Sequence, residues 1–142
     1  LSGDWSSDVC SSDLRMKIMD KEQSRVLIVE DDISSQQYYT IILEERFDLE
    51  VVATVAEAKK VLSNNEFQVA IVDISLPGGE NGIDLIKHVC EKYPVNPKCI
   101  VLTAHAFPHI REEALEAGAV EYFTKPIMSG ELIASLEKHI KA

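Results

Sequence analysis

Positive charge, long apolar runs and cysteine are all scarce in this sequence, and each shortage excludes a class of protein. The net charge of -10 argues against a nucleic-acid-binding surface, which would need clustered Lys and Arg. No apolar run approaches the roughly 20 residues that a membrane-spanning helix needs. Of the three cysteines, Cys90 and Cys99 lie in apolar contexts without C-x-x-C or metal-binding spacing. We therefore expect both thiols to be reduced core residues of a cytoplasmic protein that contacts neither nucleic acid nor a membrane directly.

The first residues differ in kind from the rest of the chain. Residues 5–14 read WSSDVCSSDL, which resembles a common sequencing-library adapter translated in frame. They are rich in Ser and Asp and show no periodic apolar pattern. We expect residues 1–15 to be a non-native, disordered leader and residues 16–24 to be a short extension. The native start would then be Met16 or Met19, unless the gene was cut at this junction.

From residue 25 onward, short apolar runs alternate with segments of helical period, a pattern typical of a parallel sheet with helices on both faces. Thr54 and Glu57 have capping-box spacing ahead of one such segment. We predict strands at Val26–Val29, Leu49–Ala53, Val69–Val72, Ile100–Leu102 and Glu121–Phe123. We predict helices at Ser34–Glu45, Ala56–Asn64, Ile83–Lys92, Pro108–Ala117 and from Ser129 onward. Together they make one α/β domain over residues 25–142.

Charged and polar residues follow the predicted strands. The run RVLIVEDD places Glu30 and Asp31 after the first strand, and Asp73 follows the third. Parallel sheets of this kind bind ligands outside the carboxyl ends of their strands, and an order of 2-1-3-4-5 makes the first and third strands neighbours. Like charges about 4 Å apart repel by roughly 4 kcal/mol at an effective dielectric near 20, so the site should hold a proton or a cation. Mg²⁺ suits such carboxylates, and Thr103 and Lys125 should reach the same edge.

Four motifs stand in order, each after its own strand: VLIVEDD, VDISLP, VLTA and YFTKP. With them the chain resembles the receiver domain of two-component response regulators, over about Arg25 to Ala142. The resemblance implies a flavodoxin-like (βα)5 doubly wound parallel sheet with strand order 2-1-3-4-5. It also implies a phosphorylation-operated switch that catalyses only its own Mg²⁺-dependent phosphorylation and dephosphorylation. Asp73 matches the family's phosphoacceptor, which takes a phosphoryl group from a histidine kinase or a histidine phosphotransfer protein.

The same resemblance assigns the metal ligands. Glu30 and Asp31 match the paired acids that hold Mg²⁺ together with Asp73, and the backbone carbonyl of Ser75 would complete the protein ligands. Whether Glu30 touches the metal directly or through water stays open. Asp32 lies beside the pair, and we expect it to cap the following helix rather than to bind the metal.

The remaining roles belong to the switch. Lys125 matches the family lysine, which would pair with Asp73 at rest and with the phosphoryl group afterwards, and its bond to Pro126 is expected to be cis. Thr103 matches the hydroxyl that donates to a phosphoryl oxygen. Tyr122 matches the aromatic residue that moves with it. Their movement would change the surface of the fourth helix, fifth strand and fifth helix, through which an unknown downstream protein or a second copy of the chain would bind.

Ser75 and His105 match the variable positions that tune how fast the acyl phosphate hydrolyses. His105 would orient water or shield the site, and the sequence does not choose between them. Three alternatives to a free-standing switch remain open. The first is the carboxy-terminal receiver fragment of a hybrid sensor histidine kinase, and the second is a degenerate receiver used only as a binding module. The third, a haloacid-dehalogenase-type hydrolase, would need an Asp where Ser75 stands.

Overall fold

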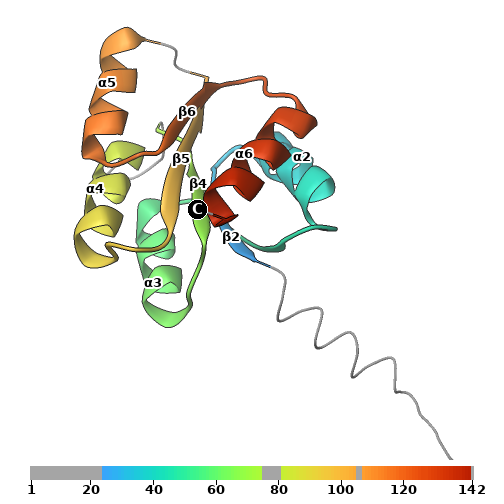
Figure 1. The fold of residues 1–142 in the computed structure, drawn as a ribbon, viewed down its shortest axis with the longest axis horizontal. Helices are drawn as coiled ribbons and strands as arrows, with labels where there is room; N and C mark the ends of the chain where they lie inside the picture. The colour runs from blue at the N-terminus through green and yellow to red at the C-terminus, as the bar shows by residue number, and fades with distance from the viewer. Residues whose placement is uncertain (1–23, 75–80, 105–106, 142) are drawn as a thin grey trace, which may run out of the picture.

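The computed structural model describes residues 24–74, 81–104 and 107–141. The predicted leader and nearly all of the predicted extension lie outside these ranges. Strands and helices alternate along the described chain (Figure 1). The strands are β2 (Arg25–Val29), β3 (Asp48–Val52), β4 (Val69–Val72), β5 (Lys98–Thr103) and β6 (Glu121–Thr124). The helices are α2 (Ile33–Leu43), α3 (Val55–Asn64), α4 (Gly82–Lys92), α5 (Pro108–Ala117) and α6 (Ser129–Lys141). Within the described ranges, none of the helices is long and apolar enough to cross a membrane.

These strands form one parallel sheet in the order β3-β2-β4-β5-β6. Counted in order of appearance this is 2-1-3-4-5, so the predicted flavodoxin-like doubly wound sheet is confirmed. From β2, the next strand along the chain is added on one side (β3), and the later strands are added on the other side, beginning with β4. Because β2 and β4 are hydrogen-bonded neighbours, the residues that follow them come together at the carboxyl edge.

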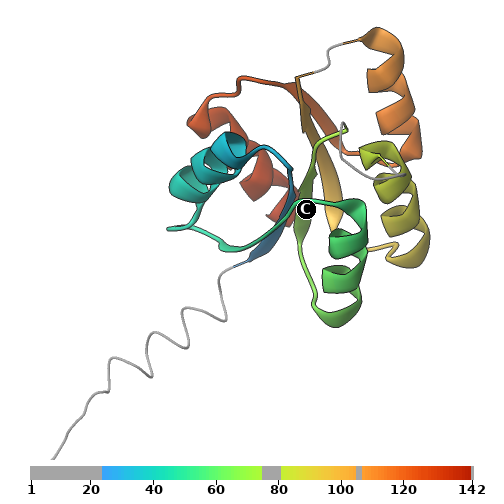
Figure 2. The same cartoon turned by 180° about the vertical axis from the view of Figure 1, so that it is seen from behind.

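Helices cover both faces of the sheet. Helices α2 and α6 lie on one face, and α3, α4 and α5 lie on the other (Figure 1, Figure 2). On the first face, Tyr39 and Leu43 of α2 pack with Leu132 and Leu136 of α6 over Ile28. All five are buried. Full burial of a Leu or Ile side chain stabilises the fold by about 2 kcal/mol, so this layer contributes substantially to holding α2 and α6 on the sheet.

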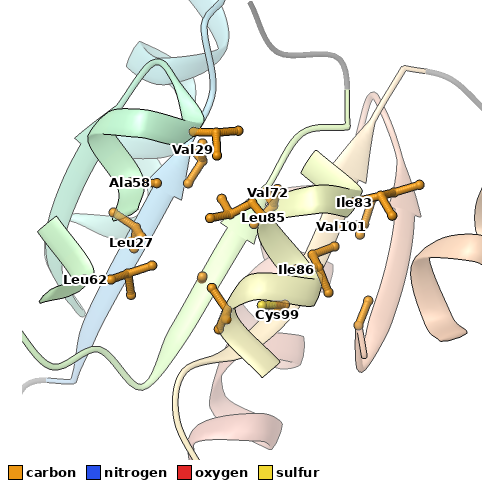
Figure 3. Packing of buried hydrophobic residues seen from close by; sticks show 14 of the residues in the cluster. Leu27, Val29, Ala58, Leu62, Val72, Ile83, Leu85, Ile86, Cys99 and Val101 are labelled. Atoms are coloured by element: carbon orange, nitrogen blue, oxygen red, sulfur yellow. The ribbon is translucent and has the colours of Figure 1, made fainter. Parts of the chain in front are cut away.

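The core on the other face is larger. Leu27 and Val29 of β2 pack with Leu62 of α3 and with Leu85 and Ile86 of α4 (Figure 3). Since every residue of β4 is buried, this central strand is shielded on both faces, which explains its continuously apolar sequence. The sheet therefore lies between two apolar layers, and the buried polar side chains of Glu30, Asp73 and Thr103 stand at the carboxyl ends of its strands.

The element boundaries differ from the predicted ones by small shifts. Strand β5 begins at Lys98 rather than Ile100, because the Lys98 N–H donates to the Gln68 carbonyl at 3.1 Å and extends the ladder. Helix α2 begins at Ile33, directly after Asp32. The carboxyl ends of β2 and β4 lie where the sequence predicts them, at Val29 and Val72, and those of β3, β5 and β6 differ from the prediction by one residue.

Candidate functional site

Backbone pairing at the carboxyl edge positions the two buried acids of the site. Strands β2 and β4 are in register with Val29 beside Val72, so Glu30 and Asp73 follow at the same level. The N–H of Asp73 donates to the carbonyl of Val29 at 3.1 Å, and the N–H of Glu30 donates to the carbonyl of Val52 at 2.9 Å. Sheet pairing thus continues one residue beyond the strands and fixes where both carboxylate side chains begin.

The carboxylates of Glu30, Asp31 and Asp73 form one acidic group. One oxygen atom from each lies within 4.8 Å of those from the other two. Glu30 and Asp73 are buried, at 2% and 7% exposure, whereas Asp31 is exposed. Their repulsion is screened least between the two buried acids. A divalent cation with oxygen ligands at about 2.1 Å fits this spacing after small side-chain movements, so the residues present suit Mg²⁺.

Lys125 supplies the positive charge within this acidic group. Its Nζ lies 2.6 Å from Oε1 of Glu30 and 3.1 Å from Oδ2 of Asp73. The N–H of Lys125 donates to the carbonyl of Thr103 at 2.8 Å, which anchors the residue just beyond β6. Its peptide bond to Pro126 is cis, as predicted. The predicted ion pair with Asp73 is present, and Glu30 is a still closer partner that the sequence did not indicate.

Burial and charge shift the protonation of this pair. Burial raises the pKa of Glu30 above its ordinary value, and the nearby charge of Asp73 adds to the shift while the hydrogen bond from Lys125 opposes it. Burial alone would lower the pKa of Lys125, but the hydrogen bond to Glu30 and the charge of Asp73 raise it above its ordinary value. Lys125 is therefore a cation throughout the neutral range, and Glu30 takes up a proton at a higher pH than an exposed glutamate does.

Hydrogen bonds from the start of α2 hold Glu30. The side-chain amide of Gln36 donates to the Glu30 carbonyl at 2.5 Å, and the N–H of Asp32 donates to Oε2 of Glu30 at 3.2 Å. Asp32 accepts from the N–H of Ser35 at 2.9 Å, so it is the N-cap of α2, as predicted. That hydrogen bond lowers the pKa of Asp32. Nothing in the sequence indicated Gln36, because no local pattern predicts a contact between a helical glutamine and a strand end.

Tyr39 lies beneath the charged groups. Its ring is buried in the core between α2 and α6. The charges of Lys125, Glu30 and Asp73 are near enough to its hydroxyl to influence the pKa of Tyr39. Burial raises the pKa of Tyr39 to about 12, so the phenol stays neutral. A neutral aromatic ring beside the ion pairs lowers the local dielectric, which strengthens them. No local pattern in the sequence indicates that Tyr39 lies near these charged groups.

Gly82, at the start of α4, touches the backbone of Asp73. A Cβ atom at this position would lie 2.3 Å from the carbonyl oxygen of Asp73 and 2.8 Å from the Cα of Ile74. The Gly82 N–H donates to the Ile74 carbonyl at 2.9 Å. Asn81 and Asp84 form a capping box that fixes this end of the helix. Glycine is thus required because α4 packs directly on the backbone around Asp73.

Thr103 and Tyr122 share one face of the sheet. Thr103 ends β5 and is wholly buried, and Tyr122 of β6 pairs in register with Val101. Alternate residues of a strand point to the same face, as do residues in register across parallel strands, so both side chains lie on the face covered by α4 and α5. Tyr122 is half-buried, and burial raises its pKa. It lines an open cavity of about 500 Å³ together with Phe107 and Arg111.

The structure thus gathers most of the predicted site at one edge of the sheet. Glu30, Asp31, Asp73 and Lys125 lie together, and Thr103 is joined to Lys125 through the backbone. Ser75 and His105 lie outside the described residues, so their assignments stay predictions.

This chain is similar to known proteins over most of its length. The family model for the response regulator receiver domain matches residues 26–137. The chain is 30% identical over 111 residues to the response regulator protein PilR of Pseudomonas aeruginosa, an alignment that covers 78% of this chain and 24% of PilR. It therefore spans about a quarter of the length of the curated relatives that it matches.

Solved structures show the same similarity. A CheY-like response regulator receiver domain protein from Methanospirillum hungatei superimposes with a TM-score of 0.79 at 30% identity, covering 84% of this chain and 94% of that one. A response regulator from Burkholderia pseudomallei, solved with a phosphorylated aspartic acid, a calcium ion and citrate, gives a TM-score of 0.74 at 25% identity, covering 84% and 69% of the two chains.

Proposed function

The chain belongs to the response regulator receiver domain family, and we propose that it accepts a phosphoryl group on Asp73 in a Mg²⁺-dependent reaction. The donor would be a histidine kinase or a histidine phosphotransfer protein. We assign residues 25–142 to the receiver domain, residues 16–24 to an extension and residues 1–15 to a non-native leader. The observation that carries the proposal is the ion pair of Asp73 with Lys125, together with two further carboxylates within 4.8 Å, at the carboxyl edge of the sheet.

The proposed reaction transfers one phosphoryl group between two side chains. An oxygen of the Asp73 carboxylate forms a bond to phosphorus while the phosphorus–nitrogen bond of a phosphohistidine breaks, and the imidazole leaves with that electron pair. The product is an acyl phosphate on Asp73. Three features favour this role: the carboxylate is buried, it is positioned by a backbone hydrogen bond, and a cation lies 3.1 Å away. The Burkholderia relative, which carries a phosphorylated aspartic acid, supports the same chemistry.

Asp31 and Asp73 would hold Mg²⁺ with Glu30 and with the backbone carbonyl of Ser75. A bound divalent cation supplies charge neutralisation between carboxylates and phosphoryl oxygens. Both oxygens of Glu30 already accept hydrogen bonds, one from Lys125 and one from Asp32. We therefore assign direct contact to Asp31 and Asp73 and contact through water to Glu30.

Lys125, Thr103 and Tyr122 would convert phosphorylation into a signal. The Lys125 ammonium would exchange its contact with Asp73 for one with the new phosphoryl group. The Thr103 hydroxyl would donate to a phosphoryl oxygen, and Tyr122 would move with it toward the protein interior. The surface formed by α5, β6 and α6 would change as a result, and a downstream protein or a second copy of the chain would recognise it. Ser75 and His105 would set the rate at which the acyl phosphate hydrolyses.

Mass spectrometry of the intact protein tests this proposal. The protein is exposed to acetyl phosphate with Mg²⁺ or with EDTA, alongside Asp73→Asn and the control Asp48→Asn, which removes an exposed acid from the opposite edge of the sheet. A single phosphoryl adduct that needs Mg²⁺, persists in Asp48→Asn and is absent from Asp73→Asn is expected. If a known receiver is modified under these conditions and this protein is not, a binding-only receiver becomes the better account.

A further inference from the structure

Two cysteines meet at the far end of α4 from the candidate site. Cys90 lies in the last turn of α4 and is half-buried, and Cys99 is the second residue of β5 and is buried. Their side chains hydrogen-bond to each other, and neither is in a disulfide. Figure 3 shows Cys99 in the same apolar cluster as Leu85 and Ile86 of α4. The two sulfur atoms therefore face each other across the contact between α4 and the sheet.

The turn between α5 and β6 holds this pair in position. Gly118 ends α5 with a φ of 125°, and a Cβ atom there would lie 2.2 Å from the Cys90 sulfur. The backbone of Gly118 therefore lies directly against that sulfur. The N–H of Val120 donates to the Cys99 carbonyl at 2.8 Å, which fixes the same turn to β5. These contacts limit the directions in which the Cys90 side chain can point.

One of the two thiols is accessible. An open cavity of about 430 Å³ between α4 and α5 reaches the Cys90 side chain. Its other lining residues are Lys87 and Glu91 of α4 and Glu113, Glu116 and Ala117 of α5. Because three of these are carboxylates and one is a cation, the cavity disfavours anionic thiol reagents such as glutathione disulfide. A small neutral oxidant is the reagent that fits.

The hydrogen bond makes the two thiols unequal. The Cys99 S–H donates to the Cys90 sulfur and lowers the pKa of Cys90 to about 7, so a large fraction is thiolate at neutral pH. The same hydrogen bond, with burial, raises the pKa of Cys99 well above its ordinary value. The accessible sulfur is thus the nucleophile, and the buried one keeps its proton.

We propose that Cys90 and Cys99 form an oxidisable dithiol in which a neutral peroxide oxidises Cys90 and Cys99 then closes a disulfide. In the first step the Cys90 thiolate attacks one oxygen of hydrogen peroxide, the O–O bond breaks and hydroxide leaves, giving a sulfenic acid. In the second step the Cys99 sulfur attacks the Cys90 sulfur, and the sulfenic hydroxyl leaves as water with the Cys99 proton. The proton that Cys90 lost on ionising converts the released hydroxide to water, so two thiols are oxidised to one disulfide and one peroxide is reduced to two waters.

Oxidation of the full-length protein tests the proposal in a Cys10→Ser background, which removes the third thiol. After hydrogen peroxide, denaturation and alkylation, the expected product has lost two hydrogens, carries no alkyl group and contains a peptide joining Cys90 to Cys99. In Cys99→Ala, the expected product is instead a Cys90 sulfenic acid that dimedone traps. Trapped sulfenic acid without a disulfide in the Cys10→Ser protein, or no oxidation of Cys90 at all, overturns the proposal.

A second measurement separates this pairing from simple exposure of Cys90. The alkylation rate of Cys90 should be half-maximal at about pH 7 in the Cys10→Ser protein. Adding Cys99→Ala should lower the rate at neutral pH about tenfold, because the donor that stabilises the thiolate is gone. An unchanged rate overturns the pairing. Neither measurement uses phosphoryl transfer, so each can fail independently of the proposed function.

Discussion

Ion pairs occur at both edges of the sheet, but the two pairs differ in how far their charged side chains are exposed to solvent. At the amino edge, Arg25 pairs with Asp48 at 3.2 Å and the Asp48 side chain is 54% exposed. At the carboxyl edge, Lys125 pairs at 2.6 Å with Glu30, whose side chain is 2% exposed. An exposed pair contributes little to stability, whereas buried charges are costly unless each is compensated. Of these two ion pairs, the buried one lies at the carboxyl edge, where the candidate site is.

Removing the buried cation should have the largest effect. Lys125→Met leaves the buried carboxylates of Glu30 and Asp73 facing each other without the ammonium cation, and we expect it to lower the free energy of unfolding by about 3 kcal/mol at pH 7.5. Urea titration without Mg²⁺ measures this. Asp48→Asn is the matched change at the amino edge, and its expected cost is about 0.5 kcal/mol. Equal costs for the two substitutions would contradict the contrast between the edges.

Mg²⁺ should relieve the repulsion within the acidic group. At a free concentration of about 100 times the dissociation constant, a cation that binds only the folded state raises the free energy of unfolding by about 2.7 kcal/mol. Thermal unfolding at increasing MgCl₂ measures this, with NaCl at matched ionic strength as the control. Asp31→Asn should weaken the effect and Asp48→Asn should not. Equal stabilisation of all three proteins would show that Mg²⁺ acts through ionic strength alone.

A smaller effect is expected from crowding the backbone at Asp73. In Gly82→Ala the new methyl group would meet the Asp73 carbonyl oxygen, so we expect a loss of about 2 kcal/mol and slower phosphorylation. Gly130→Ala is the matched control, because nothing lies within 4 Å of a Cβ atom there. That variant should be as stable as the parent or slightly more so. If Gly82→Ala is as stable as the parent protein, the backbone near Asp73 can move without a cost in free energy.

The smallest effect concerns pH. Since the folded-state pKa of Glu30 is raised above its ordinary 4.5, its contribution to stability is complete below pH 4.5 and is lost as pH rises through the folded-state pKa. The raised pKa of Lys125 does not interfere, because its contribution is lost only above pH 10.5. Urea titrations from pH 4.5 to pH 8 without Mg²⁺ should therefore show a stability difference that Glu30→Gln reduces. The same slope in both proteins would place the titrating group elsewhere.

Much of the fold was predictable because its signals are local. Continuously apolar runs identified β2 and β4, and the spacing of Thr54 and Glu57 marked the start of α3. The N–H of Glu57 does donate to the Thr54 hydroxyl, at 3.1 Å. The reciprocal half of the capping box differs, since the Glu57 carboxylate accepts from the N–H of Ala53. Such details depend on the angle at which the chain enters the helix, which spacing alone does not specify.

The sequence by itself determined which chemical groups follow each strand, and the resemblance to the receiver family implied the order in which the strands pair. Apolar runs must be buried, and Glu30, Asp73 and Lys125 stand immediately beyond them. Only the tertiary structure decided which side chains are in contact. Glu30 is the closer partner of Lys125. The backbone of Gly82 packs against that of Asp73, and the side chains of Cys90 and Cys99 hydrogen-bond to each other. Glu30 and Lys125 are 95 residues apart, and their distance depends on the register and twist of strands that do not pair directly. Local patterns specify the elements, but these contacts follow from how the packed sheet and helices place distant side chains.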